Sequence, residues 1–293
     1  MNPIGIISMQ YNRPFTAADF SQFDRWKAAG YDFAEMLVPE PGELDLAATR
    51  RALADAGLGV VLAARVNMDR NLTSDDAAKR QAGQDYLRYC AETAQALGAD
   101  VVGGPLYGNP LVFAARAPHV VTEALRQARV DWCVEGLKLG GDAAAACGVR
   151  FGVEPLNRFE TDILNTTRQG VALMKLVAHP SVGLVLDTFH MNMEDDDICT
   201  ALREAADTMI HFQANENHRG YLGTGHIDWN PVVRTLADIG YRGTISLEPF
   251  RRRDERIGIP FAQWKAPVTD EAVELRAACG FLKNLITLNG GRQ

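Results

Sequence analysis

Short runs of apolar residues alternate along the chain with longer segments of helical periodicity. Eight runs have the length and composition of strands, and several are almost continuously apolar, which is typical of strands buried on both faces. They are residues 4–9, 31–38, 59–66, 100–107, 150–155, 182–187, 209–215 and 243–249. Helical patterns lie between them, for example from Thr16 to Gly30 and from Ser74 to Gly98. This alternation predicts a parallel sheet, and eight such units favour an α/β fold of the (β/α)8, or TIM, barrel type.

A third helical pattern runs from Pro118 towards Cys147 and contains the pair Gly140-Gly141, which predicts a bend or break there. The rival architecture, a doubly wound sheet, usually carries a Gly-rich phosphate turn after its first strand. Here the first apolar run is followed by "QYNRPF", which has no glycine. No low-complexity linker interrupts the pattern, so we expect one domain over residues 1–293.

Composition and charge narrow the classes of function. With 47% hydrophobic residues the chain can bury a full core, yet it has no apolar run of membrane-spanning length. Its start, "MNPIGIISMQYN", lacks the features of a signal peptide, so we expect a cytoplasmic protein. A net charge of −7 argues against nucleic acid, and the one basic cluster, "RRRDER" at 251–256, is interpreted as a solvated loop. The five cysteines show no CxxC spacing, which indicates reduced thiols.

Polar residues gather where the late strands are predicted to end, which is where TIM barrels place their active sites. Glu154 ends the fifth strand, Asp187 the sixth and Glu248 the eighth, while Gln213 lies near the end of the seventh. Three carboxylates in one small site repel one another unless a cation lies among them. Oxygen-rich ligation suits a hard divalent cation such as Mn²⁺ or Mg²⁺, with Co²⁺ also allowed. Such an ion polarises a carbonyl, so the hydrogen on the adjacent carbon becomes acidic enough for a carboxylate base.

Four segments resemble the D-tagatose/D-psicose 3-epimerase family of the xylose-isomerase-like sugar isomerases and epimerases. They are "GVEPLNRFETD", "VLDTFHMNMED", "HFQANENHRGYLGTGHIDW" and "GTISLEPF". The resemblance covers the second half of the chain well and the first half only through its barrel periodicity. It implies a ketose 3-epimerase acting on a sugar of the D-tagatose, D-psicose or L-ribulose type. Glu154 and Glu248 would remove and return the C3 proton by way of a metal-bound enediolate.

The resemblance also implies the remaining roles. A divalent metal, most often Mn²⁺ or Co²⁺, would be held by the four strand-end residues Glu154, Asp187, Gln213 and Glu248. The O1–O3 end of the sugar would be bound by Glu160, His190 and Arg219. Relatives in the family are often dimers or tetramers, so a homodimer or homotetramer is expected.

The chain departs from the family on the seventh strand. The family pattern resembles H-x-H with the second His on the metal, whereas this chain has His211-Phe212-Gln213. Period-two alternation places His211 and Gln213 on the same inward face. We expect Gln213 to bind the metal through its amide oxygen, a weaker donor than imidazole, and His211 to lie one layer deeper in the barrel core. This departure leaves the identity of the sugar open, whereas the predicted fold does not depend on it.

Other functions are compatible with the same residues. A lyase would eliminate a leaving group from a 3-keto-glycoside after the same proton abstraction, and an aldose–ketose isomerase of the hydroxypyruvate type is a third variant. A DNA-repair endonuclease of this superfamily would need a basic groove and more than the six histidines present. A sugar-binding module without catalysis would not need two opposed carboxylates.

Four further features lie outside this set of site residues. Glu35 ends the second predicted strand and is expected either at the rim, hydrogen-bonded to a loop, or reaching the mouth of the barrel. Trp229 is expected in helix packing. His226 is expected on the surface. The segment 251–267, with Phe261 and Trp264, either covers the pocket or buries a subunit contact.

Overall fold

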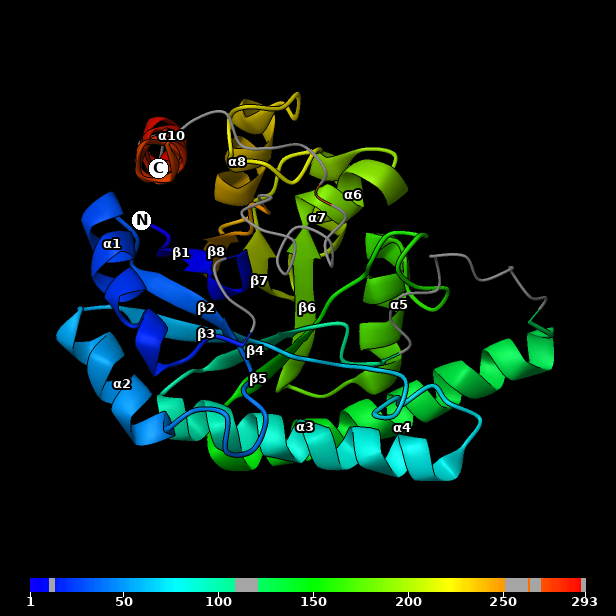
Figure 1. The fold of residues 1–293 in the computed structure, drawn as a ribbon. Coiled ribbons are helices and arrows are strands. Elements are labelled where there is room, and N and C mark those ends of the chain that lie inside the picture. Colours follow the sequence, from blue (N-terminus) through cyan, green and yellow to red (C-terminus); the bar gives the residue numbers. More distant parts are fainter. Residues whose placement is uncertain (11–13, 109–120, 251–262, 264–269, 291–293) are drawn as a thin grey trace.

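The predicted strands form a closed parallel barrel in the computed structural model, which describes residues 1–10, 14–108, 121–250, 263 and 270–290 (Figure 1). The strands are β1 (Ile4–Ile7), β2 (Phe33–Leu37), β3 (Gly59–Ala63), β4 (Val101–Gly104), β5 (Arg150–Val153), β6 (Val182–Asp187), β7 (Met209–Gln213) and β8 (Thr244–Leu247). Each strand pairs in parallel with the next, and β8 pairs with β1. The (β/α)8 barrel is therefore confirmed.

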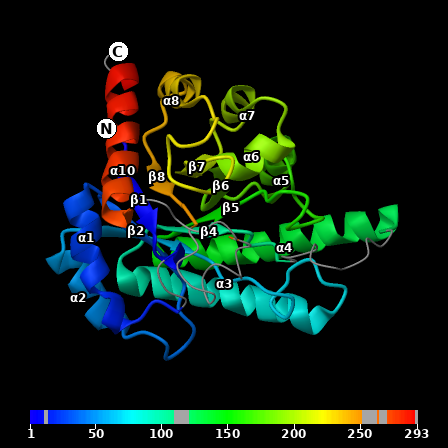
Figure 2. The ribbon, with the colours of Figure 1, turned by 45° about the horizontal axis from the view of Figure 1, so that its top comes forward.

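Helices follow the strands and surround the barrel (Figures 1 and 2). They are α1 (Ser21–Ala29), α2 (Leu46–Asp55), α3 (Ala77–Leu97), α4 (Glu123–Cys147), α5 (Thr167–Val177), α6 (Thr188–Glu194), α7 (Ile198–Glu204), α8 (Trp229–Asp238) and α10 (Glu271–Gly290), with short 3-10 turns η1 (Ser8–Gln10) and η2 (Ala17–Asp19). Gly30 and Gly98 end α1 and α3 in the left-handed conformation, as their positions in the sequence predict. The side chain of Asp76, two residues beyond the predicted Ser74, caps the start of α3.

Helix α4 is continuous over its whole described length, so it does not break at Gly140-Gly141. A Cβ atom at Gly140 would lie 2.6 Å from Leu87 Cδ1 of α3, and one at Gly141 would lie 2.5 Å from His179 Nδ1. These glycines allow neighbouring elements to approach α4 closely, which explains why both positions lack a side chain. Figures 1 and 2 both show α3 and α4 side by side. The predicted start at Pro118 lies outside the described residues.

The apolar core lies between the strands and the surrounding helices, with Phe23, Trp26 and Phe151 among its fully buried members. None of the described helices combines the length and apolarity that crossing a bilayer requires. The basic cluster at 251–256 lies outside the described residues, as does the segment 251–267 apart from residue 263.

Candidate active site

The four late strands bring the predicted metal ligands to one rim of the barrel. Glu154, Asp187, Gln213 and Glu248 are 6%, 1%, 4% and 5% exposed. The Cα of Asp187 is in register with Gln213, and Gln213 is in register with Ser246, two residues before Glu248. Aligned residues on neighbouring strands project to the same side, so these side chains line one end of the barrel interior.

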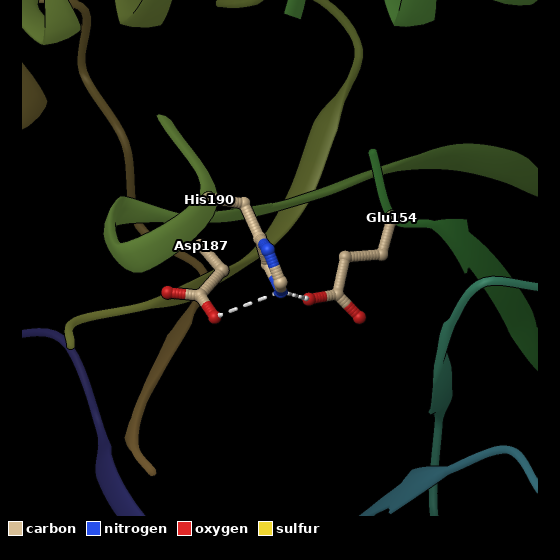
Figure 3. A group of neighbouring side chains, drawn as sticks. All are labelled: Glu154, Asp187 and His190. Carbon is tan, nitrogen blue, oxygen red and sulfur yellow. Dashed lines mark ion pairs between the residues drawn. The ribbon is translucent and has the colours of Figure 1, made fainter. Parts of the chain in front are cut away.

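Glu154, Asp187 and His190 point towards a common centre (Figure 3). His190 Nε2 lies 3.5 Å from Glu154 Oε1 and 3.6 Å from Asp187 Oδ2. One potential ligand atom from each of the three residues lies within 4.8 Å of the other two. Asp187 also caps α6, because its Oδ1 accepts a hydrogen bond from Phe189 N–H at 2.8 Å. That bond holds the second oxygen, Oδ2, towards the centre.

Arg219 supplies a positive charge among these carboxylates. Its Nη2 lies 3.3 Å from Asp187 Oδ2 and 3.1 Å from Glu248 Oε2. Its guanidinium carbon lies 4.3 Å from the ring centroid of Phe189 and 4.6 Å from that of Phe250. Arg219 adopts a left-handed backbone conformation, with φ 53°, that residues other than glycine adopt only at a cost in energy. The sequence predicts this residue at the substrate, and the structure adds its contact with two of the carboxylates.

The hydrogen bonds around His190 assign its tautomer. The backbone N–H of Asn157 donates to His190 Nδ1 at 3.0 Å, and Asn157 Nδ2 lies 2.9 Å from the same atom. Nδ1 is therefore an acceptor, which places the proton of the neutral ring on Nε2. Burial, followed by the charge of Arg219, holds the pKa of His190 well below its ordinary value. Asn157 Nδ2 also donates to Glu160 Oε1 at 2.9 Å, so Glu160 lies beside the same group.

Glu35 lies inside the barrel, not at a loop-bonded rim position as predicted. It is 0% exposed and accepts hydrogen bonds from Gln213 Nε2 at 2.9 Å and from the Ser246 hydroxyl. His211 Nε2 lies 3.4 Å away, and its Nδ1 lies 2.7 Å from Thr244 Oγ1. The donors of β7 and β8 satisfy the carboxylate there, which explains its interior position. Burial alone would raise the pKa of Glu35, but the His211 interaction and these hydrogen bonds together lower it.

Burial raises the pKa of the carboxyl groups at the centre. For Glu154, burial and then the nearby charges of Asp187 and Glu248 raise the pKa well above its ordinary value. For Glu248, burial outweighs the opposing charge of Arg219, and the pKa rises to about 8. Burial also raises the pKa of Asp187, although Arg219 opposes it. At neutral pH the site therefore holds protons that exposed carboxyl groups would have lost.

Two asparagines complete the site, and the sequence reasoning missed both. Asn157 holds His190 and Glu160, as described above. Asn215 Oδ1 accepts a hydrogen bond from the backbone N–H of Glu248 at 2.7 Å, and its Nδ2 lies 3.4 Å from Glu248 Oε2. Asn215 stands two residues after Gln213, so the same period-two rule could have found it.

Trp229 and His226 lie outside the site, where the sequence predicts them. Trp229 is 3% exposed and donates from Nε1 to Glu216 Oε1 at 2.7 Å, which is a packing role. His226 is exposed. Neither residue joins the carboxylates at the barrel rim.

Comparison with known proteins extends the likeness through the first half of the chain. The family model described as the xylose isomerase-like TIM barrel matches residues 23–285. The D-psicose 3-epimerase of Agrobacterium fabrum is 31% identical over 265 residues, which is 89% of each chain. A solved structure of L-ribulose 3-epimerase superposes with a TM-score of 0.89 at 30% identity, covering 99% of this chain and 96% of that one.

A second solved structure, D-psicose 3-epimerase with D-tagatose from Clostridium cellulolyticum H10, superposes with a TM-score of 0.87 at 26% identity. It covers 97% of this chain and 99% of the relative. The barrel, the buried group of carboxylates and these similarities over nearly the whole length agree with one another. The chain belongs to the ketose 3-epimerase family within the xylose isomerase-like TIM barrel superfamily.

Proposed function

We propose that the chain is a divalent-metal-dependent ketose 3-epimerase that acts on free ketoses of the D-tagatose, D-psicose or L-ribulose type. One observation carries the proposal: two buried carboxyl groups, Glu154 and Glu248, come from strands three positions apart around the barrel and lie at the same rim. Family membership supports it, since the relatives include a D-psicose 3-epimerase and an L-ribulose 3-epimerase.

The donor set fits a hard divalent cation. Gln213 Oε1 is buried and has no hydrogen-bond partner among the described residues, and an unpaired buried carbonyl oxygen is a ready cation ligand. Its neighbours are carboxylates, so Mn²⁺ is the first choice and Co²⁺ or Mg²⁺ the alternatives. The residues that would hold the ion are Glu154, Asp187, Gln213 and Glu248. A bound cation would polarise the sugar carbonyl and make the adjacent C–H more acidic.

His190 is better suited to bind the sugar than the metal. Its Nε2 carries the proton of the neutral ring, because Nδ1 accepts from Asn157. A protonated nitrogen has no lone pair for a metal, although the distances to Glu154 and Asp187 alone would allow ligation. Nε2–H would instead donate to a sugar oxygen. Arg219 and Glu160 would bind neighbouring oxygens at the same end of the sugar.

The two carboxyl groups suit a reaction in which a proton is removed and another is returned. An epimerase needs one group ionised and one protonated at the same moment, and the roles exchange when the reaction runs backwards. Burial raises the pKa of both groups and so favours their protonated form, whereas a bound cation would favour the ionised form. Glu154 or Glu248 would take the C3 proton from one face, and the other carboxyl group would return a proton to the opposite face.

Conversion of candidate sugars tests the proposal. The protein is stripped with EDTA, reloaded with Mn²⁺, Co²⁺ or Mg²⁺, and incubated with fructose, psicose, tagatose and ribulose. Chromatography should detect the C3 epimer of at least one ketose, and Glu154→Gln and Glu248→Gln should each abolish it. Glu194→Gln is the matched control, because that carboxylate bonds only to the backbone N–H and side chain of Arg158 among the described residues and should leave the rate unchanged.

Other products would replace the proposal with a different reaction. An aldose formed from a ketose would indicate an isomerase. Elimination from a 3-keto-glycoside, with no epimer from any free ketose, would indicate a lyase.

A further inference from the structure

Among the residues that the structure describes, Glu35 is hydrogen-bonded to one proposed metal ligand, Gln213, and its charge, after the larger effect of burial, also raises the pKa values of Glu154 and Glu248. It belongs to β2, which is separated from β8 by β1 alone, and its side chain reaches β7 and β8 through the barrel interior. Its Oε1 accepts one hydrogen bond, from Gln213 Nε2 at 2.9 Å. Its Oε2 is held separately, by the Ser246 hydroxyl and by His211 Nε2 at 3.4 Å. Each oxygen therefore has its own partners, which fixes the plane of the carboxylate.

This contact determines which end of the Gln213 amide faces the site. An ionised carboxylate accepts hydrogen bonds and donates none, so only the NH2 end of the amide can face Glu35. The opposite end, Oε1, must then point away from Glu35. Gln213 is in register with Asp187, and its Oε1 is buried without a hydrogen-bond partner among the described residues. An amide turned the other way would set Oε1 against the carboxylate and present hydrogens to the other ligands.

The same bond strengthens Gln213 as a donor. A hydrogen bond from the amide nitrogen to a carboxylate is charge-assisted and draws electron density towards the carbonyl oxygen. Loss of a group that hydrogen-bonds to a metal ligand in this way typically lowers metal affinity about 10- to 100-fold.

We propose that Glu35 is a positioning residue, which orients and polarises the Gln213 amide so that its oxygen serves as the fourth metal ligand. This inference rests on the proposed function, because it takes the metal site as given. It goes beyond that function by assigning a role to a residue of the first half of the chain that touches neither metal nor sugar. It also explains how this chain can use Gln213 where the family uses histidine.

Mn²⁺ affinity measured without sugar tests the proposal, by titration calorimetry and by electron paramagnetic resonance of free Mn²⁺. Glu35→Gln keeps the shape of the side chain but removes the charge, and its amide can face Gln213 with either end. We expect it to weaken Mn²⁺ binding about 10- to 100-fold. Glu35→Asp, which withdraws the carboxylate by one methylene, is the second variant and should weaken binding in the same direction.

A double-mutant cycle shows whether Glu35 acts through Gln213. Gln213→Ala removes the ligand, so adding Glu35→Gln to it should change the Mn²⁺ affinity by less than about threefold. Thr244→Val is the matched control, because it removes the hydroxyl that contacts His211 Nδ1 but keeps all three residues that contact the Glu35 carboxylate, namely Gln213, Ser246 and His211. This control should bind Mn²⁺ as the wild type does, whatever its effect on thermal unfolding.

Three results would overturn the proposal. The first is unchanged Mn²⁺ affinity in a folded Glu35→Gln protein. The second is an equal loss of affinity with and without Gln213. The third is failure of both Glu35 variants to fold, since the carboxylate would then serve the barrel and not the amide. A wild type that binds no Mn²⁺ would instead refute the proposed function, and that result is obtained before any variant is made.

Discussion

Mn²⁺ binding should release protons at neutral pH, because the pKa of Glu248 is raised to about 8 in the metal-free site. A metal ligand must be ionised, so the apparent binding constant follows the ionised fraction of the group. With a pKa of about 8, that fraction is about 1% at pH 6 and about half at pH 8. One such proton raises the apparent affinity about 50-fold across this range, and a second proton on Glu154 would steepen the change.

Calorimetry in buffers of different ionisation enthalpy measures this release directly. The heat of Mn²⁺ binding at pH 7 should vary with the buffer, giving one proton or more released per ion. The dissociation constant should fall steadily from pH 6 to pH 8. Equal heats in all buffers, with a constant affinity over this range, would mean that the carboxyl groups are already ionised before the metal binds, and would refute the reasoning.

The same pKa fixes how pH changes the stability of the metal-free protein. The pKa of Glu248 is about 8 when folded, above the roughly 4.3 of an unfolded glutamate, so the folded chain holds more protons between these values. Its stabilising contribution is complete below the unfolded pKa and is lost as pH rises through the folded pKa, by up to ~1.4 kcal/mol per pH unit. Urea unfolding of the EDTA-treated protein should show stability falling from pH 6 to pH 8, and excess Mn²⁺ should oppose the fall. Stability that rises with pH in the metal-free protein would contradict this assignment.

Three substitutions test other parts of the account. Gln213→His should tighten Mn²⁺ binding about tenfold, or ~1.4 kcal/mol, because imidazole is a stronger donor than an amide; calorimetry would show weaker binding if Gln213 is not a ligand. Arg219→Lys should lower kcat/KM for the best ketose at least about tenfold, since lysine lacks the planar guanidinium that contacts two aromatic rings while its Nη2 lies against two carboxylates. Gly140→Ala should lower the free energy of unfolding by about 1–3 kcal/mol through its contact with Leu87, and unchanged urea unfolding would show that α3 and α4 can separate freely.

The sequence predicted the barrel well because each strand is signalled locally. Runs such as residues 182–187 are apolar enough to indicate a strand buried on both faces. The helix break predicted at Gly140-Gly141 does not occur, because that prediction used local helix propensity and no information on distant contacts. Glycine lowers helix propensity, but here its lack of a side chain serves contacts with Leu87 and His179, which are distant in sequence.

In the candidate site, too, local sequence patterns identified some residues, whereas contacts between distant residues could not be predicted. The strand ends and the family resemblance identified the residues that the structure gathers at one rim. The interior position of Glu35 could not be predicted, because it depends on donors from β7 and β8 that lie about 180 to 210 residues further along the chain. The tautomer of His190 depends likewise on the backbone of Asn157, 33 residues away.

Deuterium exchange at C3 tests the central claim most directly. Mn²⁺-loaded protein is incubated in D₂O with the ketose that it converts best, and proton NMR follows the C3 signal of substrate and epimer. We predict that deuterium enters at C3 in the wild type and that the C3 epimer accumulates with it. Both Glu154→Gln and Glu248→Gln should lose epimer formation while still binding the sugar. Epimer formation without deuterium at C3, or full activity in either variant, would contradict proton transfer by this pair of carboxyl groups.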